Sequence, residues 1–404
     1  MLLVATWVLL AAGSFRCVSQ AISPAARPVR IFVTDARLDR LPLYAAAIRV
    51  RQEISPTIWF VTGSPFADRR LAVLTDGAAQ MTMFSRAGVD AAVLTPEWLT
   101  FGLPRLSKMM AGARFYSLSA SLLDNAGQTI GHPFMVRRSG TAVVSAAGIA
   151  LDSGDVLNHL AGVRYAAPGL AAGKAMALMR QRADLVGVMV EPHSSGSAWG
   201  ADFTVNMDTS GVFAMTPSSD RARVNCYDVS ADAGRLTARA VNLDQVKPDL
   251  DMARLLDSIR SAADSVAARS IPLPRSLWTP ERLSVRLVEG LLTAGLADGF
   301  LCDSLFVADF QEPKDVGALV TLLRDPGRLA ILKVQGDVLS GWPEELALRQ
   351  GLSRSRLSRG LTYRVATTVE YLQRHPGIAL PGFELSSRPF WTICQDILES
   401  GEVK

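Results

Sequence analysis

The sequence predicts an α/β protein of two domains, and three observations support this. Its 404 residues are more than one ordinary hydrophobic core accommodates. The first half alternates short β-branched runs with helical patterns, which is typical of layered α/β sheets. Further on, Ile271-Pro272-Leu273-Pro274 ends a long helical pattern, because proline cannot continue a helix interior. We therefore predict a first domain over residues 22–247, a linker helix over 248–270 and a second domain over 271–404.

Each element follows from its local pattern. In the first domain, β-branched runs predict strands at 29–34, 57–62, 89–94, 114–118, 134–138, 141–149 and 184–190. Helical spacing of apolar residues predicts helices at 41–54, 68–87 and 103–111. Strand-like runs from 201 to 243, with little helix between them, predict a second and more antiparallel sheet. After the amphipathic helix at 248–269 we expect helices at 279–294 and 315–323, and strands at 299–307, 329–334 and 361–366.

The composition is that of a globular protein with a mixed surface. Hydrophobic residues make up 49% of the chain and charged residues 20%, far from the composition of disordered proteins. The net charge of +4 comes from 42 basic and 38 acidic residues scattered along the sequence. Because no run of basic and aromatic residues appears, we expect no nucleic-acid partner.

The N-terminus predicts export. Residues 2–13 are apolar and of signal-peptide length, too short to span a bilayer. Ser19 and Ala21 are small residues at the −3 and −1 positions of a cleavage site, so residues 1–21 are interpreted as a signal peptide. Contact with a membrane is expected only if Cys17 is lipidated, and its preceding residues form a poor lipobox. We expect a periplasmic or extracellular protein.

Three cysteines follow the predicted cleavage site: Cys226, Cys302 and Cys394. They are far apart and in no metal-type spacing. One disulfide is possible in an oxidising compartment, and buried free thiols are the preferred interpretation.

Several segments, in order along the chain, resemble motifs of one enzyme family. Residues 88–91 and 101–103 are similar to a G-x-D-A…G-N-H-E-F-D-x-G-L stretch. Residues 133–149 are similar to a pair of strands, and 183–186 to a strand that leads to a metal-binding histidine. Residues 329–339 and 363–367 are similar to later strands. Together they resemble the 5′-nucleotidases and UDP-sugar hydrolases. The resemblance implies a four-layer α-β-β-α metallophosphatase-like sandwich followed by a smaller α/β 5′-nucleotidase C-terminal-like domain.

The resemblance also implies a two-metal centre for phosphoester hydrolysis, held by Asp, His and Asn side chains. In this sequence its positions fall on Ala36, Leu38, Ser64, Pro96, Glu97 (in place of the catalytic histidine) and Val190 or Glu191. The G-H-x-H motif, near residues 206–210, holds no histidine, and the chain's histidines lie elsewhere, at His132, His159, His193 and His375. Alanine, leucine, proline and valine side chains offer no donor atom. We therefore predict no metal, no other cofactor and no catalytic residue.

The nucleotide clamp implied by the resemblance is altered as well. Its N-G-G-G-I-R loop falls on residues 303–308, where Leu305 and Phe306 replace glycines and Ala308 replaces arginine. Its two base-stacking aromatics fall near residues 324–327 and 375–378, where no Phe, Tyr or Trp occurs. Both the guanidinium and the stacking faces are predicted to be lost.

Two weaker patterns remain as alternatives. Asp35, Asp39, Glu97 and Asp208 lie near the lost metal positions, and Asp35, Glu97 and Asp208 form a weak candidate cation site. His193 stands beside several serines, and we interpret this stretch as a solvated loop rather than a nucleophile with its base.

The leading hypothesis is an exported pseudoenzyme that keeps the fold for binding or scaffolding, with an unknown protein or small-molecule ligand. One alternative is residual metal-dependent 5′-nucleotidase or phosphoester hydrolase activity. The other is a small-ligand receptor that uses the interdomain cleft, since clefts between domains are favoured pockets.

Overall fold

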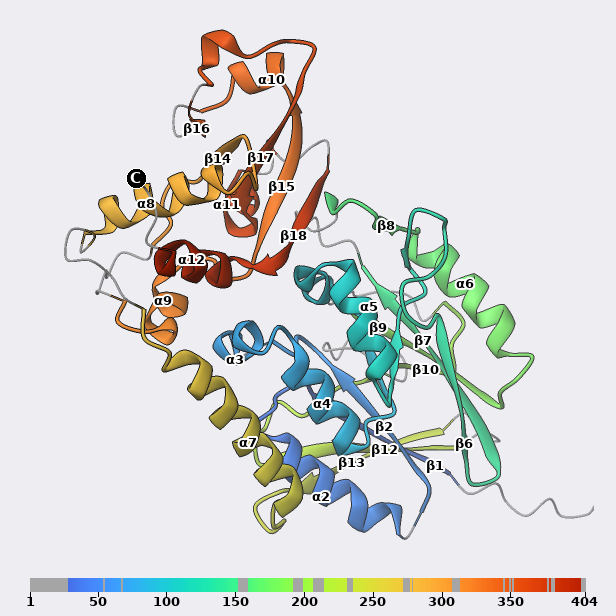
Figure 1. Cartoon of the computed structure of the whole chain (residues 1–404). Helices are drawn as coiled ribbons and strands as arrows, with labels where there is room; N and C mark the ends of the chain where they lie inside the picture. Colours follow the sequence, from blue (N-terminus) through green and yellow to red (C-terminus); the bar gives the residue numbers. More distant parts are fainter. Residues whose placement is uncertain are drawn as a thin grey trace, which may run out of the picture.

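The computed structural model describes residues 28–53, 55–66, 68–151, 159–191, 199–205, 214–230, 235–271, 277, 279–306, 313–343, 346–348, 350, 352–375, 378 and 382–400. The predicted signal peptide, Cys17, His193 and Asp208 lie outside these residues. Within them, two sheets and their helices form the first half of the molecule and a third sheet forms the second (Figure 1).

The first sheet has six strands in the order β13 (Arg235–Asn242), β12 (Arg223–Ser230), β1 (Val29–Asp35), β2 (Thr57–Thr62), β3 (Ala91–Val93) and β4 (Tyr116–Leu118). Strands β1 to β4 run parallel, and β12 is antiparallel to β1. The second sheet has the order β11 (Ala214–Met215), β10 (Phe203–Val205), β9 (Leu185–Glu191), β7 (Ala142–Ala150) and β6 (Phe134–Ser139). A short ribbon pairs β5 (Leu122–Leu123) with β8 (Arg164–Tyr165).

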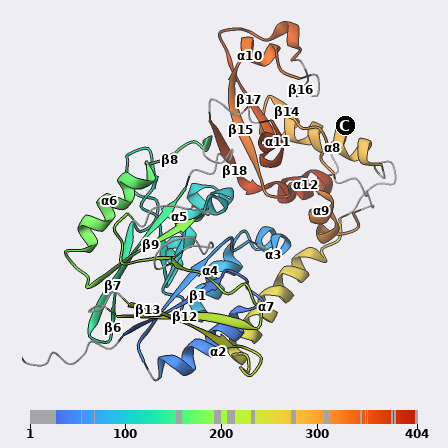
Figure 2. The same cartoon turned by 180° about the vertical axis from the view of Figure 1, so that it is seen from behind.

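The two sheets pack face to face, which confirms the predicted four-layer sandwich. Alternate side chains of β1 and β2, such as Ile31 and Phe60, share one buried cluster with Val144 and Met189 of the second sheet. The outer face of the first sheet is covered by α2 (Leu41–Gln52), α4 (Ala78–Ala87), α5 (Leu103–Gly112) and α7 (Leu250–Ala267). The outer face of the second sheet is covered by α6 (Pro168–Met179). Figures 1 and 2 show this arrangement from opposite sides.

The second half is a smaller α/β unit. Its sheet has the order β16 (Ala347–Leu348), β14 (Gly299–Leu301), β17 (Thr362–Thr368), β15 (Arg328–Gln335) and β18 (Phe383–Pro389). One face is packed by α8 (Pro280–Thr293), α9 (Val316–Leu322) and α12 (Phe390–Glu399). The unit also contains α10 (Gly336–Ser340), α11 (Val369–Arg374) and a short 3-10 helix, η4 (Arg354–Arg356).

Local capping explains where several helices begin. Asp249 accepts hydrogen bonds from two backbone N–H groups at the start of α7. Thr279, followed by a proline, caps α8, and Asp315 caps α9 in the same way. Side-chain oxygens at these positions satisfy N–H groups that the helix itself cannot pair. These starts agree with the predicted helices at 279–294 and 315–323 to within one residue.

Three expectations about the elements were wrong. Residues 68–87 form two helices, α3 (Arg69–Leu74) and α4, because Asp76 and Gly77 adopt positive φ angles of 48° and 76° and break the helix. The strands between 201 and 243 are divided between both sheets of the sandwich instead of forming a sheet of their own. The strand expected at 299–307 ends at Leu301. Helices α6 and α12 and strand β18 were not predicted.

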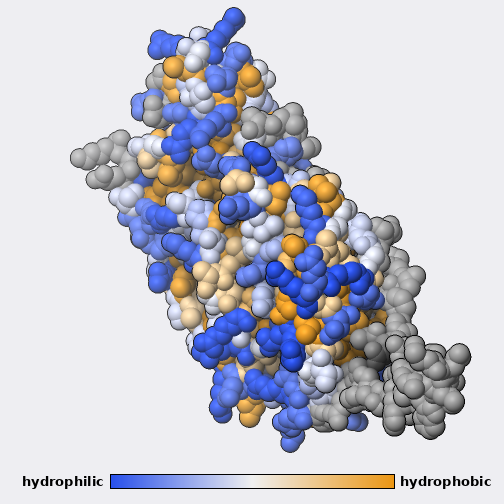
Figure 3. All heavy atoms as spheres, turned by 90° about the vertical axis from the view of Figure 1, so that its right-hand side faces the viewer, coloured by the Kyte–Doolittle hydropathy of each residue, from blue (hydrophilic) through white to orange (hydrophobic). Residues whose placement is uncertain are grey.

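The predicted linker helix is packed along the first domain. Helix α7 lies against α2, α3 and α4 and reaches α9 at its far end (Figure 1). The proposed boundaries at residues 247 and 270 stay predictions. No helix among the described residues is long and apolar enough to cross a membrane. On the face shown in Figure 3, hydrophilic residues are interspersed with small hydrophobic patches.

Candidate functional site

The carboxyl ends of β1, β2 and β3 meet at the edge of the first sheet, where α/β proteins commonly bind ligands. Here three of the implied positions, Ala36, Leu38 and Pro96, carry side chains without a donor atom. Ala36 and Leu38 are 3% and 5% exposed and belong to the apolar core. Pro96 is buried at the start of the 3-10 helix η1 (Pro96–Phe101), and Ser64 is exposed. This donor set does not fit the two metal ions of a phosphoesterase.

Two of the nearby carboxylates, those of Asp35 and Asp39, are engaged in other contacts. Asp35 accepts hydrogen bonds from the Tyr44 hydroxyl at 3.1 Å and the Arg37 backbone N–H at 3.3 Å. Burial, and secondarily the Asp35 charge, raises the pKa of Tyr44 to about 12. Asp39 pairs with Arg37 at 3.4 Å. Asp208 of the candidate cation site lies outside the described residues, and within those residues no three His, Cys, Asp or Glu side chains group as a metal site.

Glu191 is a buried carboxyl at the end of β9. It is 3% exposed, and the Gly63 backbone N–H donates to its Oε1 at 2.8 Å. Burial raises the pKa of Glu191 to about 7, with the Gly63 hydrogen bond lowering it and the Glu97 charge adding to the increase. The resemblance put a histidine at residue 190 or 191. In this protein, Val190 is an apolar core residue and Glu191 links the end of the second sheet to the loop after β2.

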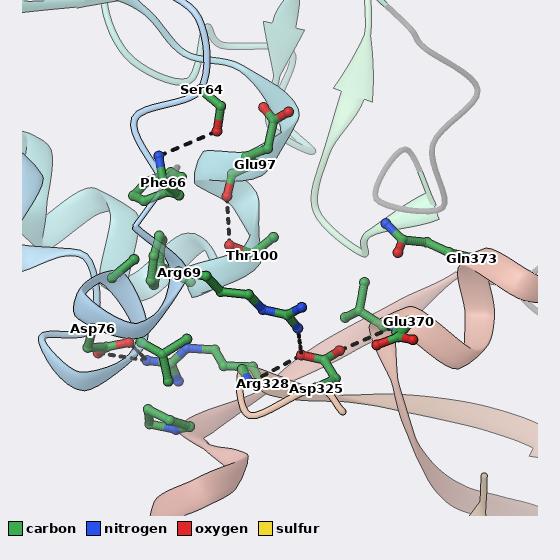
Figure 4. Close-up of a pocket in the computed structure, with 16 residues that line it drawn as sticks. Ser64, Phe66, Arg69, Asp76, Glu97, Thr100, Asp325, Arg328, Glu370 and Gln373 are labelled. Atoms are coloured by element: carbon green, nitrogen blue, oxygen red, sulfur yellow. Dashed lines mark hydrogen bonds and ion pairs between the residues drawn. The ribbon is translucent and has the colours of Figure 1, made fainter. Parts of the chain in front are cut away.

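A pocket of about 350 Å³ lies beside this edge, between the two halves of the molecule (Figure 4). Nine lining residues come from the first half, among them Ser64, Arg69 and Glu97. Seven come from the second, mainly from the loop before β15 and from α11. Its position explains why residues distant in sequence contribute to one site.

Two ion pairs cross between the halves at this pocket. Arg328, with a side chain only 5% exposed, donates to both carboxylate oxygens of Asp76 at 3.0 and 2.9 Å and to the Ser386 carbonyl at 2.7 Å. Arg105 also binds Asp76, at 3.0 Å. Arg69 extends from α3 to Asp325 at 3.4 Å, as Figure 4 shows. The first pair is mostly buried and fully hydrogen-bonded at the carboxylate, so it orients the two halves.

Aromatic side chains form one wall of the pocket. The Phe66 ring meets the Trp98 ring edge-on at a centroid distance of 5.0 Å and the Phe101 ring at 4.9 Å. Both distances and both tilted geometries are typical of favourable aromatic pairs. Trp98, Phe101, Phe306, Phe390 and Trp391 are buried, and Trp342 is partly buried against the same core as Trp98.

The structure brings together some of the residues that the sequence singled out. Ser64 and Glu97 line the pocket, and so do Asp325 and Gly327 of the segment where a stacking aromatic was implied. Residues Asp303 and His375 do not line it: Asp303 pairs with Arg374 at 2.7 Å. His375 stacks on Tyr371 at 4.3 Å.

Sequence reasoning missed the pocket residues Arg69, Asp76, Arg328 and Glu370. The Asp76-Gly77 pair inside a helical pattern was a usable signal, because Asp-Gly marks turns. The other three give no signal in sequence, since they meet only after the two halves pack together.

The three cysteines are free thiols in the structure. Burial raises the pKa of Cys226 and of Cys302 to about 11, and that of Cys394 well above its usual value. High thiol pKa values make these residues poor nucleophiles at neutral pH.

No family model and no curated protein matches the sequence. Solved structures do share the fold. A Staphylococcus aureus protein assigned as a 5′-nucleotidase, solved with alpha-ketoglutarate, aligns over 92% of this chain and 97% of its own, with 12% identity and a TM-score of 0.54. The sulfate thiohydrolase SoxB of Thermus thermophilus aligns over 89% and 79%, with 15% identity and a TM-score of 0.52. The NAD nucleotidase NadN of Haemophilus influenzae aligns over 92% and 96%, with 11% identity and a TM-score of 0.51.

These similarities define the class of protein by fold: a two-domain metallophosphatase-like protein. More narrowly, the chain has the architecture of the 5′-nucleotidases, as the sequence resemblance implied. Because the identities are low, the similarity extends to the fold and not to the activity of these proteins.

Proposed function

We propose that the protein is a non-catalytic binding protein that holds a small ligand in the pocket between its two domains. The observation that carries this proposal is the replacement of metal-binding positions by the buried apolar side chains of Ala36 and Leu38. Metal-assisted hydrolysis draws its rate from a bound hydroxide and from neutralisation of the phosphate charge. Glu97, at the position implied for the catalytic histidine, would instead repel a phosphate.

The pocket favours ligand binding over pure scaffolding. It is lined by residues of both domains and combines an aromatic wall with several charged groups. Sites for small molecules commonly have this form, a concave and partly apolar surface with a few polar groups, placed between domains. A protein partner that uses other surfaces is the second form of the binding hypothesis.

The test is a thermal-shift screen of small metabolites with the full mature chain and a pocket-filling variant. Thr100→Trp places a large side chain in the pocket, and Thr293→Trp, on the exposed surface of α8, is the matched control. We expect a ligand that raises the melting temperature of the unmodified chain and of the control but not of Thr100→Trp. Equal shifts in all three proteins would contradict the proposed site.

Residual phosphoester hydrolase activity is the alternative, through a metal moved to Glu97 and Asp208. Assays of AMP, ATP and UDP-glucose with manganese, cobalt or zinc should show no turnover above background, and elemental analysis should find no stoichiometric metal. Metal-dependent turnover that disappears in Glu97→Ala would establish the alternative in place of the binding function.

We also propose that the chain is exported and cut after Ala21. Mass spectrometry of the protein from fractionated cells should find a mature N-terminus at Ile22 outside the cytoplasm. Full-length protein in the cytoplasm would contradict export.

A further inference from the structure

The charges that line the interdomain pocket are unevenly paired. The lining holds four carboxylates and two guanidinium groups. Both guanidinium groups are committed: Arg328 to Asp76 and Arg69 to Asp325. Asp325 also accepts from the backbone N–H groups of Gly327 at 3.1 Å and Glu370 at 3.2 Å. Each guanidinium group of the lining is therefore paired with a carboxylate of the lining, Arg328 in a mostly buried contact and Arg69 in an exposed one.

The other two carboxylates have no such compensation. Glu97 stands on the first domain's side of the pocket and Glu370 on the second domain's side (Figure 4). Among the described residues, neither carboxylate forms an ion pair or a side-chain hydrogen bond. The Glu97 charge also acts on its surroundings, because it contributes to the raised pKa of buried Glu191. The pocket thus carries a negative potential that a phosphate or nucleotide would oppose.

The aromatic wall adds a surface suited to the body of a cationic ligand. Phe66 and Phe101 line the same pocket as the two glutamates. Aromatic faces attract ammonium and guanidinium groups and also pack against methylene chains. A bare metal ion gains nothing from such a wall and prefers a closer set of oxygen ligands.

We propose that the pocket binds an organic cation, with ammonium or guanidinium groups held by Glu97 and Glu370 and an aliphatic body against Phe66 and Phe101. The inference rests on the proposed binding function and names its ligand class. The two glutamates come from different domains, so a ligand with two cationic groups joined by an aliphatic chain is the best match. Spermidine is the probe for this class.

Isothermal titration of the full mature chain with spermidine tests the proposal. We expect one saturable site, weakened roughly tenfold by Glu97→Gln and by Glu370→Gln, since each substitution removes one charge-assisted hydrogen bond. Glu289→Gln, an exposed glutamate on α8, is the matched control and should bind as the unmodified chain does. Unchanged circular dichroism spectra of the variants would show that each remains folded.

Several outcomes would overturn the proposal. Spermidine could fail to bind, or the three glutamine variants could bind it equally, which would mean general attraction to the surface. Stoichiometric calcium binding that Glu97→Gln abolishes would identify a metal site instead. AMP binding that Thr100→Trp abolishes would refute the cationic ligand and still support the proposed binding function. If Thr100→Trp changes no ligand's binding, both proposals fail.

Discussion

Glu191 makes a structural contact at the place where the resemblance implied a metal-binding histidine, at residue 190 or 191. A carboxyl group that is 3% exposed, with one backbone N–H donating to it, is costly to ionise. Its position at the end of β9 faces the edge where the fold family implies metal ligands. Here the group ties the second sheet to the loop after β2, and its protonation state becomes part of the stability of the molecule.

We predict that Glu191 makes the protein less stable as the pH rises from about 4.5 to about 7. In this window the unfolded chain has released the proton, with an ordinary pKa of 4.5, while the folded protein keeps it, with a pKa of about 7. The unfolded state binds fewer protons, so the free energy of unfolding falls with pH, by about 3 kcal/mol at most for this group.

The measurement compares urea unfolding of the unmodified protein and Glu191→Gln at pH 4.5 and pH 8. Other titrating groups cancel in the difference between the two proteins. We expect this difference to shift in favour of the glutamine variant at the higher pH. A difference that does not change with pH would show that Glu191 titrates normally. In a Glu97→Gln background the upper limit of the window should fall while the lower limit stays, because one source of the raised pKa in the folded protein is removed.

At the scale of elements, the approach of the two sheets depends on a glycine in β7. Gly148 lies against the backbone of Leu118 in β4. The Ala120 N–H donates to the Gly148 carbonyl at 2.7 Å. A Cβ atom at this position would stand 2.5 Å from the Leu118 carbonyl oxygen, which is closer than van der Waals contact allows. The sheets can therefore meet at this corner only because the residue has no side chain.

We predict that Gly148→Ala destabilises the protein by about 1–3 kcal/mol, because the added methyl group forces backbone apart in a packed core. Gly173→Ala is the matched control. Gly173 is exposed on α6, and a Cβ atom added there would meet open space, so the same change should stabilise by about 0.5–1 kcal/mol through helix propensity. Chemical unfolding measures both. Similar effects of the two substitutions would contradict the close approach of β4 and β7.

The turn between α3 and α4 carries a contact between the two domains. Positive φ angles at Asp76 and Gly77 turn the chain out of the helix and direct the Asp76 carboxylate to Arg328 of the second domain. Replacement of Gly77 would also bring a Cβ within 3.0 Å of Met109. The turn at Asp76 and Gly77, which a continuous helix would lack, thus places Asp76 for the most buried ion pair between the domains.

For the whole molecule, we predict that Asp76→Asn loosens the two domains. The Arg328 guanidinium would lose its carboxylate while still buried, at an expected cost of about 2–4 kcal/mol. Hydrogen exchange should then increase at the α3–α4 turn and in β18, and remain unchanged in α6, which is distant from the contact.

Asp251→Asn is the control for this prediction. Asp251 pairs with Arg254 at 3.8 Å, with both side chains highly exposed, and exposed pairs contribute less than about 1 kcal/mol. If Asp76→Asn and Asp251→Asn have the same effect on stability and exchange, the Asp76–Arg328 pair does not hold the domains together.

The sequence by itself determined the fold class and most strands of the first domain. Strand β2 was predicted at 57–62, its observed bounds, because a short run of β-branched and aromatic residues between Pro56 and Gly63 favours a strand over a helix. The same local information identified Ala36, Leu38 and Pro96 as residues without metal-binding atoms. Side-chain chemistry needs no coordinates.

Only the tertiary structure decided where the strands between 201 and 243 pair and which charges face the interdomain pocket. Strand β12 pairs with β1, almost 200 residues earlier, and local periodicity carries no record of a partner so distant. Arg328 and Asp76 likewise meet across 252 residues. Hydrogen bonds between strands and ion pairs between domains depend on packing in space, so the pocket that carries the proposed function became visible only in the folded chain.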